Sequence, residues 1–360
     1  MESVYITKSP EETIKLGKNL ANSLKPGDTV LLYGKLGSGK THFIKGIAAG
    51  LGIKATIKSP TYAYVNKFPI PNPQSPIKYA SQKYKHLFYH YDLYRFEKGG
   101  DVASIGFEET LEDPNVINVV EWADRLGRHL PAKHITVRLK GDGNSRKIEI
   151  KFISPAILGE SEIQKYFDEW ATPMHVRRHS EIVTKVAMEV AKAYIKKLEI
   201  VNTELLYPAC MLHDLNRVCD FRKLDRDRFQ EEVTDEKWAK WQSCRREYKG
   251  MHHAEITAKI LNERGFTETA ELIRLHRSDY IVTQAHDLDS IEKKIIYYAD
   301  KRVKHDEIVS LKERFRDGRE RYGKFDTAGE RRLFEDVEKQ TIKLEKGLFK
   351  GLDIKPGDIK

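Results

Sequence analysis

The sequence predicts two domains of different fold class, an α/β P-loop NTPase domain with a mainly parallel sheet and then an all-α domain. Three observations predict this. The chain has 360 residues, more than one hydrophobic core usually serves. Strand-like and helix-like segments alternate over the first part of the chain. Later the apolar residues recur with helical spacing almost to the end. We therefore predict domains at 1–155 and 156–325, followed by a charged helical tail at 326–360.

The first domain consists of short apolar segments separated by helical or polar ones. Thr29–Tyr33 reads as a buried strand, and a helical stretch follows it through Ala49. Later strands of the same character are expected at Leu87–His90, Val116–Val120, Ile135–Leu139 and Ile148–Ile150. This alternation is typical of a parallel sheet with crossover helices. The proline-rich segment Phe68–Pro76 has no periodicity, so we expect a surface insertion there and not a core element.

The second domain begins after a strand exit at Ile153–Pro155. From about Ser161 the pattern is helical, and five apolar residues share one face of the first long helix: Ile182, Val183, Val186, Ala187 and Val190. The densely charged stretch 312–324 favours a solvated helical face, with contact to tRNA or a partner as the alternative.

Composition restricts the class of protein. Hydrophobic residues make up 40% of the chain and charged residues 32%, and no apolar run is long enough to span a bilayer, so we expect no membrane association. The segment Met1–Tyr5 lacks the features of a secretion signal, so we expect a cytoplasmic protein. The three cysteines show no metal-type spacing, and we expect reduced, partly buried thiols. The net charge of +9 favours a polyanionic partner such as tRNA, or phosphate-handling sites.

A phosphate-binding loop of the Walker A type spans Gly34–Thr41, between the predicted strand and the predicted helix. Glycine is needed because backbone N–H groups must converge on phosphate oxygens without obstruction by a Cβ atom. Lys40 brings a positive charge to the phosphates, and Thr41 brings a hydroxyl ligand for Mg²⁺. The alternative, a chance glycine-rich turn, does not explain the flanking strand and helix. The predicted nucleotide-binding residues in the loop are Gly34, Gly37, Ser38, Gly39, Lys40 and Thr41.

Four further segments follow in a set order: Ser59–Tyr62, His90–Arg95, Ile105–Glu109 and Val120–Asp124. With the Walker A loop they resemble the TsaE (YjeE-like) family, P-loop ATPases that serve the bacterial threonylcarbamoyl-transfer complex. The resemblance covers about the first 150 residues. No Asn-Lys-x-Asp segment is present, which favours ATP over GTP.

The TsaE resemblance implies ATP and Mg²⁺ as ligands. Glu121 would hold Mg²⁺ beside Thr41, Asp92 would lie near the metal and the attacking water, and Thr61 would sense the γ-phosphate. For Asp92, a structural salt bridge with Arg95 remains the alternative. The implied partners are the threonylcarbamoyltransferase complex, formed by TsaB and TsaD homologues, and tRNA as a further candidate. Two departures from the family pattern are Lys35, where an acidic residue is usual, and the proline-rich insertion.

Histidines and aspartates of the second domain form an ordered series that resembles the HD phosphohydrolase superfamily, in its two-metal variant. The series is His179, His213, Asp214, His253, His276 and Asp300. The resemblance implies a first metal site completed by Asp300 and a second one at His253 and His276, with Asp214 as the catalytic centre of the set. His252 is the alternative to His253. Mixed imidazole and carboxylate ligands suit Fe, Mn, Co, Ni or Zn.

These features predict a bifunctional protein of tRNA N6-threonylcarbamoyladenosine (t6A) modification. One site would hydrolyse ATP, and the other would hydrolyse a nucleotide, either a nucleoside monophosphate or a dinucleoside polyphosphate. Two alternatives stay open: a small-molecule kinase that uses the same P-loop, and an ATPase whose second domain is a non-catalytic scaffold for tRNA or the transferase complex. Four basic residues near the candidate ligands either bind substrate phosphate or form solvated surface: Arg177, Arg178, Lys301 and Arg302.

Overall fold

The computed structural model describes residues 3–60, 63–71, 84–97, 102–141, 145–322 and 327–360. The chain divides into two compact units. The N-terminal unit comprises Glu2–Pro155 together with Tyr194–Asn202, and the helical unit comprises Ala156–Ala193 together with Thr203–Lys360. Within the described residues, none of the helices combines the length and the apolar content that a bilayer crossing requires.

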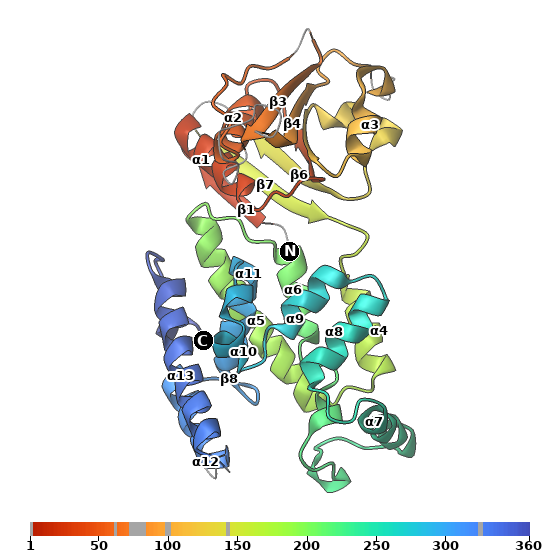
Figure 1. Cartoon of the computed structure of the whole chain (residues 1–360), viewed down its shortest axis with the longest axis vertical. Helices are drawn as coiled ribbons and strands as arrows, with labels where there is room; N and C mark the ends of the chain where they lie inside the picture. The colour runs from red at the N-terminus through yellow and green to blue at the C-terminus, as the bar shows by residue number, and fades with distance from the viewer. Residues whose placement is uncertain (1–2, 61–62, 72–83, 98–101, 142–144, 323–326) are drawn as a thin grey trace. The chain divides into compact units, whose positions relative to one another are not determined.

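The N-terminal unit contains a seven-stranded sheet of order β1-β7-β6-β2-β5-β4-β3 (Figure 1). The four central strands, β6, β2, β5 and β4, run parallel, and the strands at both edges pair antiparallel. The expectation of an α/β fold with a largely parallel sheet is therefore confirmed. The strands are β1 (Ser3–Thr7), β2 (Thr29–Tyr33), β3 (Val65–Pro71), β4 (Tyr84–Asp92), β5 (Val116–Glu121), β6 (His134–Lys140) and β7 (Arg146–Ile153).

Helices cover both faces of this sheet. The central strand β2 shows why, since its side chains are apolar on both faces and each face needs a covering layer. Val30 and Leu32 face a core shared with α1 (Pro10–Ala21) and α2 (Lys40–Gly50). Leu31 points to the opposite face, where α3 (Phe107–Glu112) and the preceding turn Val102–Ile105 pack. Successive residues of a strand alternate between faces, so one continuous apolar segment supplies two cores.

Helices α1 and α2 approach each other closely at two glycines. A Cβ atom on Gly17 would lie 2.1 Å from the carbonyl oxygen of Phe43, and one on Gly46 would lie 2.1 Å from that of Ile14. Only residues without side chains allow this approach. The contact determines the position of α2, whose first residue is Lys40.

The proline-rich segment differs in part from the expectation of a surface insertion. Its first residues belong to β3, which pairs antiparallel with β4 at the edge of the sheet. Phe68 and Ile70 pack against the core, while Pro69 and Pro71 are tolerated because an edge strand leaves one row of N–H groups unpaired. Residues 72–76 lie outside the described residues. Strand β1 was also not anticipated.

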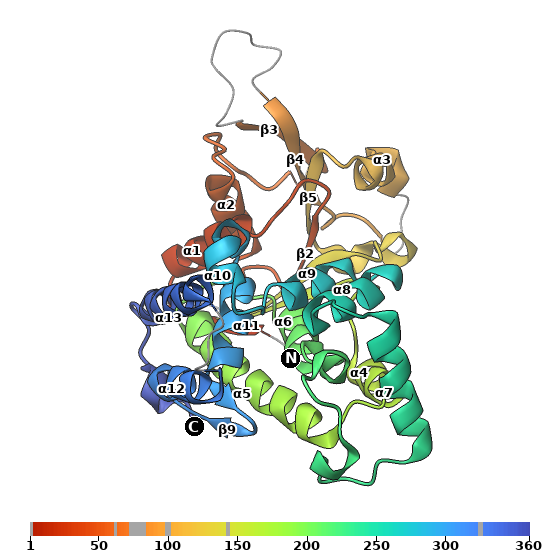
Figure 2. The same ribbon diagram turned by 60° about the horizontal axis from the view of Figure 1, so that its bottom comes forward.

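The remaining chain is helical, as the sequence predicts, apart from a small ribbon of β8 (Val303–Lys304) and β9 (Glu307–Ile308). Helices α6, α9 and α11 pack together (Figure 2). Their buried faces carry Leu206, Ile273 and Ile296. The first helices are α4 (Glu160–Glu169), α5 (Met174–Lys196), α6 (Thr203–Leu212), α7 (Asp235–Glu247) and α8 (His253–Glu263). The later ones are α9 (Thr267–Arg274), α10 (Tyr280–Thr283), α11 (Ile291–Lys301), α12 (Leu311–Tyr322) and α13 (Ala328–Phe349).

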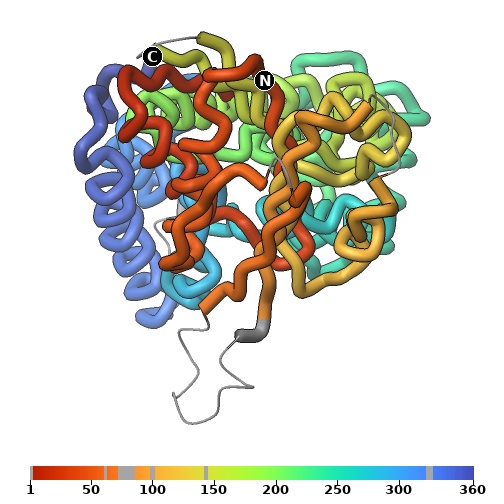
Figure 3. Tube along the Cα trace, turned by 90° about the horizontal axis from the view of Figure 1, so that it is seen from above, coloured from red at the N-terminus to blue at the C-terminus, as the bar shows by residue number. Residues whose placement is uncertain are grey.

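The C-terminal helix is part of the helical unit and not a separate tail. Helices α12 and α13 lie side by side, blue in Figure 3, and Phe315 contacts Phe334 edge to face. Thr341 of α13 is buried against Tyr297 of α11, with 3.3 Å between the two hydroxyl oxygens. The last helix therefore contributes to the core of this unit.

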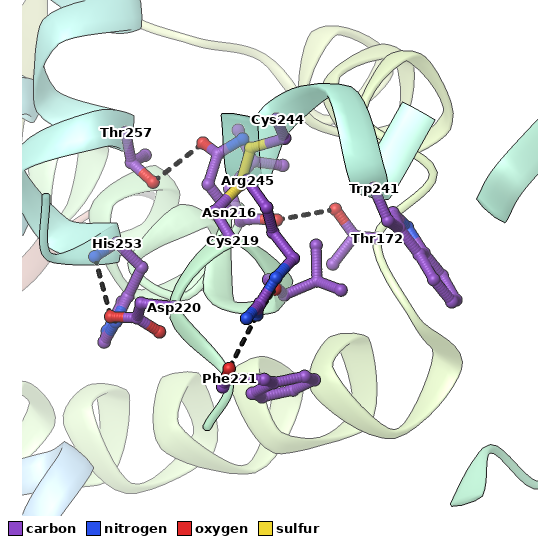
Figure 4. The surroundings of a disulfide bond; sticks show 12 residues. Thr172, Asn216, Cys219, Asp220, Phe221, Trp241, Cys244, Arg245, His253 and Thr257 are labelled. Carbon is purple, nitrogen blue, oxygen red and sulfur yellow. Dashed lines mark hydrogen bonds and ion pairs between the residues drawn. A yellow bond between two sulfur atoms is a disulfide. The ribbon is translucent and has the colours of Figure 1, made fainter. Parts of the chain in front are cut away.

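Two of the three cysteines form a disulfide, contrary to the expectation of reduced thiols. Cys219 and Cys244 are joined across a sequence separation of 25 residues, with their Cα atoms 5.6 Å apart (Figure 4). Cys210 is free and buried. The bond links the turn η5 (Arg217–Asp220) to α7, and such pairing is not apparent from cysteine spacing.

Candidate nucleotide site and candidate metal centre

The Walker A loop lies between β2 and α2. Gly37 and Gly39 have φ angles of 79° and 99°, a region that favours glycine. A Cβ atom on Gly34 would lie 2.7 Å from the carbonyl oxygen of Leu139, so this residue also needs to be glycine. The hydroxyl of Ser38 is buried without a hydrogen-bond partner among the described residues. A buried, unsatisfied polar atom in this loop fits a phosphate ligand.

Lys40 is the first residue of α2 and points back over the loop. Its Nζ donates to the carbonyl oxygens of Gly34 at 2.8 Å and Lys35 at 3.1 Å, and lies 3.8 Å from the ring centroid of Trp122. Burial lowers the pKa of Lys40, although the nearby carboxylate of Glu121 opposes this shift. A nucleotide phosphate would replace the loop carbonyls as the partner of this ammonium.

The two predicted magnesium ligands, Thr41 at the start of α2 and Glu121 at the end of β5, face each other. The hydroxyl of Thr41 donates to both carboxylate oxygens of Glu121, each at 3.4 Å. Glu121 ends β5, is 3% exposed, and has its Oε1 2.9 Å from His90 Nε2. Hydroxyl and carboxylate oxygens are the ligands that Mg²⁺ prefers, so these residues fit the ion. The sequence interpretation did not single out His90 as a functional residue.

Asp92 lies next to Glu121 at the carboxyl end of β4, because the two residues are paired in register between parallel strands. Its carboxylate accepts hydrogen bonds from the hydroxyl of Ser59 and from the backbone N–H of Tyr94. Asp92 is buried. Its predicted alternative partner, Arg95, follows within the same loop. Thr61 lies outside the described residues.

A buried arginine that the sequence interpretation missed supports the loop. Arg146 Nε donates to the carbonyl oxygen of Ser38 at 3.2 Å, and the side chain packs over Gly39. Arg146 begins β7, far along the chain from the loop, and no local pattern indicates this contact. It holds the peptide between Ser38 and Gly39 in place.

The helical unit brings all six predicted metal ligands together. His179 comes from α5, His213 and Asp214 directly follow α6, and His253 begins α8. His276 follows α9, and Asp300 lies near the end of α11. The ligand atoms of two three-residue groups, His179 with His213 and Asp214, and Asp214 with His253 and His276, lie within 4.8 Å of one another.

Asp214 belongs to both groups through different oxygens. Its Oδ2 lies 3.9 Å from Nε2 of both His179 and His213. Its Oδ1 lies 2.8 Å from His253 Nε2 and 3.5 Å from His276 Nε2. Asp300 extends the first group, with its Oδ1 3.3 Å from His179 Nε2 and 3.7 Å from His213 Nε2. The two oxygens of Asp214 therefore face different pairs of histidines.

Hydrogen bonds orient each imidazole. Nδ1 of three histidines faces a backbone carbonyl: His179 faces that of His305 at 2.7 Å, His213 that of Cys210 at 2.7 Å, and His276 that of Ile273 at 2.6 Å. A carbonyl only accepts, so Nδ1 carries the proton in each ring, and Nε2 presents a lone pair when the ring is neutral. This is the arrangement found in metal-ligating histidines.

His253 is oriented by a carboxylate. Its Nδ1 lies 2.7 Å from Asp220 Oδ2, and the same oxygen accepts from its backbone N–H at 3.0 Å (Figure 4). Asp220 was not predicted from the sequence. His252, the alternative ligand, caps α8 through its Nδ1, which accepts from the backbone N–H of Ala254 at 3.1 Å, and it forms a third group of possible ligands with Asp220 and His253.

The donor set fits divalent metals. His213 Nε2 is buried without a hydrogen-bond partner among the described residues. The Nε2 atoms of His253 and His276 lie 3.0 Å apart, and His253 Nε2 lies 2.8 Å from Asp214 Oδ1. Ligands about 2.1 Å from one metal ion lie roughly 3.0–3.4 Å apart, which matches this spacing.

The electrostatics leave the carboxylates ionised. Burial alone would raise the pKa of Asp214, but the neighbouring charges of His213 and His253 outweigh it and hold the pKa well below its ordinary value. Burial likewise opposes ionisation of Asp220, yet the hydrogen bonds and charge of His253 lower its pKa to about 2. Burial lowers the pKa of His276 to about 4, whereas burial of His213 is outweighed by the carboxylates of Asp214 and Asp300, which raise its pKa. Ionised carboxylates are the form that binds metals, and a metal ion would displace a proton from any charged imidazole among its ligands.

Of the four basic residues considered for phosphate binding, three make internal contacts. Lys301 pairs with Asp300 and donates to the carbonyl oxygen of His276 at 2.9 Å. Arg302 is buried and bonds the carbonyl oxygen of Val309. Arg177 donates to the carbonyl oxygens of Thr172 and Phe167, and Arg178 is exposed.

A cation that the sequence interpretation missed lies beside the ligands. Arg217 Nε is 3.9 Å from Asp214 Oδ2, and its Nη1 donates to Asp220 Oδ1 at 2.6 Å. The side chain of Arg217 is 34% exposed.

Comparisons with known proteins match the N-terminal part of the chain. A family model described as "Threonylcarbamoyl adenosine biosynthesis protein TsaE" matches residues 7–148. The protein of this name from Rickettsia conorii is 36% identical over 146 residues, covering 40% of this chain and 75% of the relative. That from Treponema pallidum is 33% identical over 141 residues, covering 39% and 93%. The solved structure of Bacillus subtilis YdiB covers 43% of this chain and 87% of its own, at 28% identity and a TM-score of 0.33.

Proposed function

This chain belongs to the TsaE family, and on that premise we propose that its N-terminal unit hydrolyses Mg²⁺-bound ATP in support of t6A modification of tRNA. The observation that carries the proposal is the pairing of a Walker A loop with Glu121, whose carboxylate faces the hydroxyl of Thr41. Thr41 and Glu121 would hold Mg²⁺, which neutralises phosphate charge when bound.

Each neighbouring residue has a role in this proposal. Lys40 exchanges its loop carbonyl partners for the β- and γ-phosphates. His90 holds the Glu121 carboxylate at 2.9 Å and so orients it toward Thr41. Asp92 orients the attacking water, because it lies beside Glu121 at the sheet edge, and Thr61 senses the γ-phosphate. The ATPase would reset a threonylcarbamoyltransferase complex of TsaB and TsaD homologues after turnover.

A matched pair of variants tests the ATPase. Glu121→Gln removes the carboxylate beside Thr41 and should abolish Mg²⁺-dependent phosphate release, while nucleotide binding persists through the loop. Glu112→Gln makes the same chemical change at an exposed position of α3 and should leave the rate unchanged. Equal activity of the two variants, with and without added TsaB and TsaD homologues, would contradict the assignment.

The helical unit, in this proposal, is an HD-type metal-dependent nucleotide phosphohydrolase. Its supporting observation is the convergence of the Nε2 atoms of four histidines on Asp214 and Asp300. His179, His213, Asp214 and Asp300 would hold one metal ion, and Asp214, His253 and His276 a second. When bound, such a pair acidifies a water molecule and neutralises phosphate charge. Arg217, whose Nε lies 3.9 Å from Asp214 Oδ2, would bind a phosphate oxygen.

Elemental analysis of the purified full-length chain tests this second activity, together with a phosphate-release screen over nucleoside monophosphates and dinucleoside polyphosphates. Asp214→Ala should lose metal and phosphohydrolase activity together, while ATP hydrolysis shows that the N-terminal unit is folded and an unchanged helical circular-dichroism signal shows that the helical unit is folded. His252→Ala should keep its metal, because that ring caps α8. A wild-type protein that retains no added Fe, Mn, Co, Ni or Zn and releases no phosphate would leave the unit as a scaffold.

A further inference from the structure

Three ring side chains lie next to one another beside the candidate metal centre: His175, Phe221 and Phe229. We call them the aromatic wall. The rings of His175 and Phe221 are nearly parallel, at 19°, with centroids 6.2 Å apart. The centroid of Phe229 lies 5.7 Å from that of His175 and 6.4 Å from that of Phe221. These separations are within the range of interacting aromatic rings.

The aromatic wall adjoins the metal ligands on two elements. His175 is four residues before His179 on α5, so the two side chains lie on the same face of that helix. Phe221 directly follows Asp220, whose carboxylate orients His253 (Figure 4). The aromatic wall is therefore built on the segments that carry one candidate ligand, His179, and the residue that orients another, Asp220.

Arg217 connects the two regions. Its Nε lies 3.9 Å from Asp214 Oδ2, and its guanidinium carbon lies 5.7 Å from the ring centroid of Phe221. A positive charge thus lies between the carboxylate that would bridge the metals and the first ring of the wall. This order, a phosphate-binding group followed by flat rings, matches the order of phosphate and base in a nucleotide.

The wall is open to solvent where core packing alone would cover it. His175 is exposed, and Phe221 and Phe229 are half-buried. Trp241, which contacts Phe229 at a centroid distance of 4.6 Å, is by contrast buried. The ring stack therefore begins in the core of the unit and ends at the surface, where it presents aromatic surface to a ligand. Any nucleobase can stack on such a surface, because every base has a flat aromatic face.

We infer that the aromatic wall binds the base of a nucleotide whose phosphate lies at Arg217 and the metal ligands. The inference rests on the proposed phosphohydrolase site and adds to it the group that selects nucleotides over other phosphoesters. A sugar phosphate, which has no base, would contact Arg217 and the metal ligands but would make no contact with the aromatic wall.

Equilibrium dialysis of the full-length Lys40→Ala variant tests this inference, because that substitution weakens nucleotide binding at the Walker A loop. The probes are adenosine 5′-monophosphate and ribose 5-phosphate, which differ by the base. Adding Phe221→Ala should weaken binding of the nucleotide by about 5- to 150-fold and change binding of the sugar phosphate by less than about 2-fold. Phe221→Tyr keeps a ring and should restore nucleotide binding.

The kinetic form of the test compares KM with kcat on the same two probes. Loss of stacking should raise KM for the nucleotide, with metal content unchanged. A nucleotide that binds in a wall-dependent way but is not hydrolysed would reject the phosphohydrolase and keep the base site. An unchanged ratio of the two affinities in Phe221→Ala, or no binding of the nucleotide to Lys40→Ala, would overturn the inference.

Discussion

Replacing Gly17 with alanine should both destabilise the N-terminal unit and slow ATP hydrolysis. The added Cβ would lie 2.1 Å from the carbonyl oxygen of Phe43, whereas ordinary contacts begin at 3.4 Å, so α1 and α2 must separate by about 1 Å. Overpacking against backbone costs about 3 kcal/mol, and alanine regains about 1 kcal/mol of helix propensity. The net loss in free energy of unfolding should therefore be about 2 kcal/mol.

The effect on catalysis follows from the position of α2. Its first two residues are Lys40 and Thr41, so the same displacement moves the ammonium and the hydroxyl away from the phosphates and Mg²⁺. A misplacement of about 1 Å at a reacting centre costs about 100-fold in rate. Steady-state phosphate release measures this loss, and hydrogen exchange over α1 and α2 locates the destabilisation.

Gly347→Ala is the matched control. This glycine also lies within a helix, α13, but an added Cβ would have nothing within 4 Å. Here alanine should stabilise the protein by about 0.5–1 kcal/mol, with ATP hydrolysis unchanged. If Gly17→Ala matched Gly347→Ala in both stability and rate, the close approach of α1 and α2 would be refuted.

Three further perturbations have defined outcomes. Asp220→Asn weakens the group that orients His253 and should lower metal affinity by about 10- to 100-fold, measured by titration against a metal buffer. Burial lowers the pKa of His134, so the unfolded state binds a proton more tightly than the folded state does. The free energy of unfolding should therefore fall as the pH drops below about 6.5, the pKa of a histidine in the unfolded chain. Measured by urea unfolding, the free energy of unfolding of His134→Asn should fall less over this pH range than that of wild type. Cys219→Ser opens the loop closed by the bond to Cys244 and should cost about 3 kcal/mol of stability.

Controls separate these effects from general damage. Asp227→Asn removes an exposed carboxylate from the same loop and should leave metal affinity unchanged. An equal loss in both variants would argue against the role of Asp220. For His134→Asn, a fall between about pH 7.5 and 5.5 identical to that of wild type would contradict the pKa argument. For the disulfide, wild type treated with reductant should match Cys219→Ser, and thiol titration of unreduced wild type should find Cys210 alone.

Much of the N-terminal unit could be read from the sequence because its signals are local. The Walker A loop is eight contiguous residues between a strand and a helix, and its glycine requirement follows from backbone geometry alone. The central strands are continuous apolar runs because helices cover both faces of the sheet. Strand β3 was missed because its prolines suggest a loop, and the edge position that tolerates them is a property of the assembled sheet.

The supporting residues were not apparent from the sequence. Arg146 reaches Ser38 across 108 positions, and His179 is oriented by the backbone carbonyl of His305, which carries no side-chain signal. The disulfide between Cys219 and Cys244 joins two segments whose spacing matches no known pattern.

The sequence by itself determined the types of chemistry available: a glycine loop with a lysine for phosphate, and an ordered set of histidines and aspartates suited to metals. Only the tertiary structure decided which side-chain atoms lie next to one another, because these contacts form when elements far apart in the chain pack together. It directs the two oxygens of Asp214 to different histidine pairs, turns His253 and not His252 toward them, and places Arg217 and the aromatic wall beside the centre. Such directions follow from helix packing and hydrogen bonding across long separations in the chain, which no local pattern encodes.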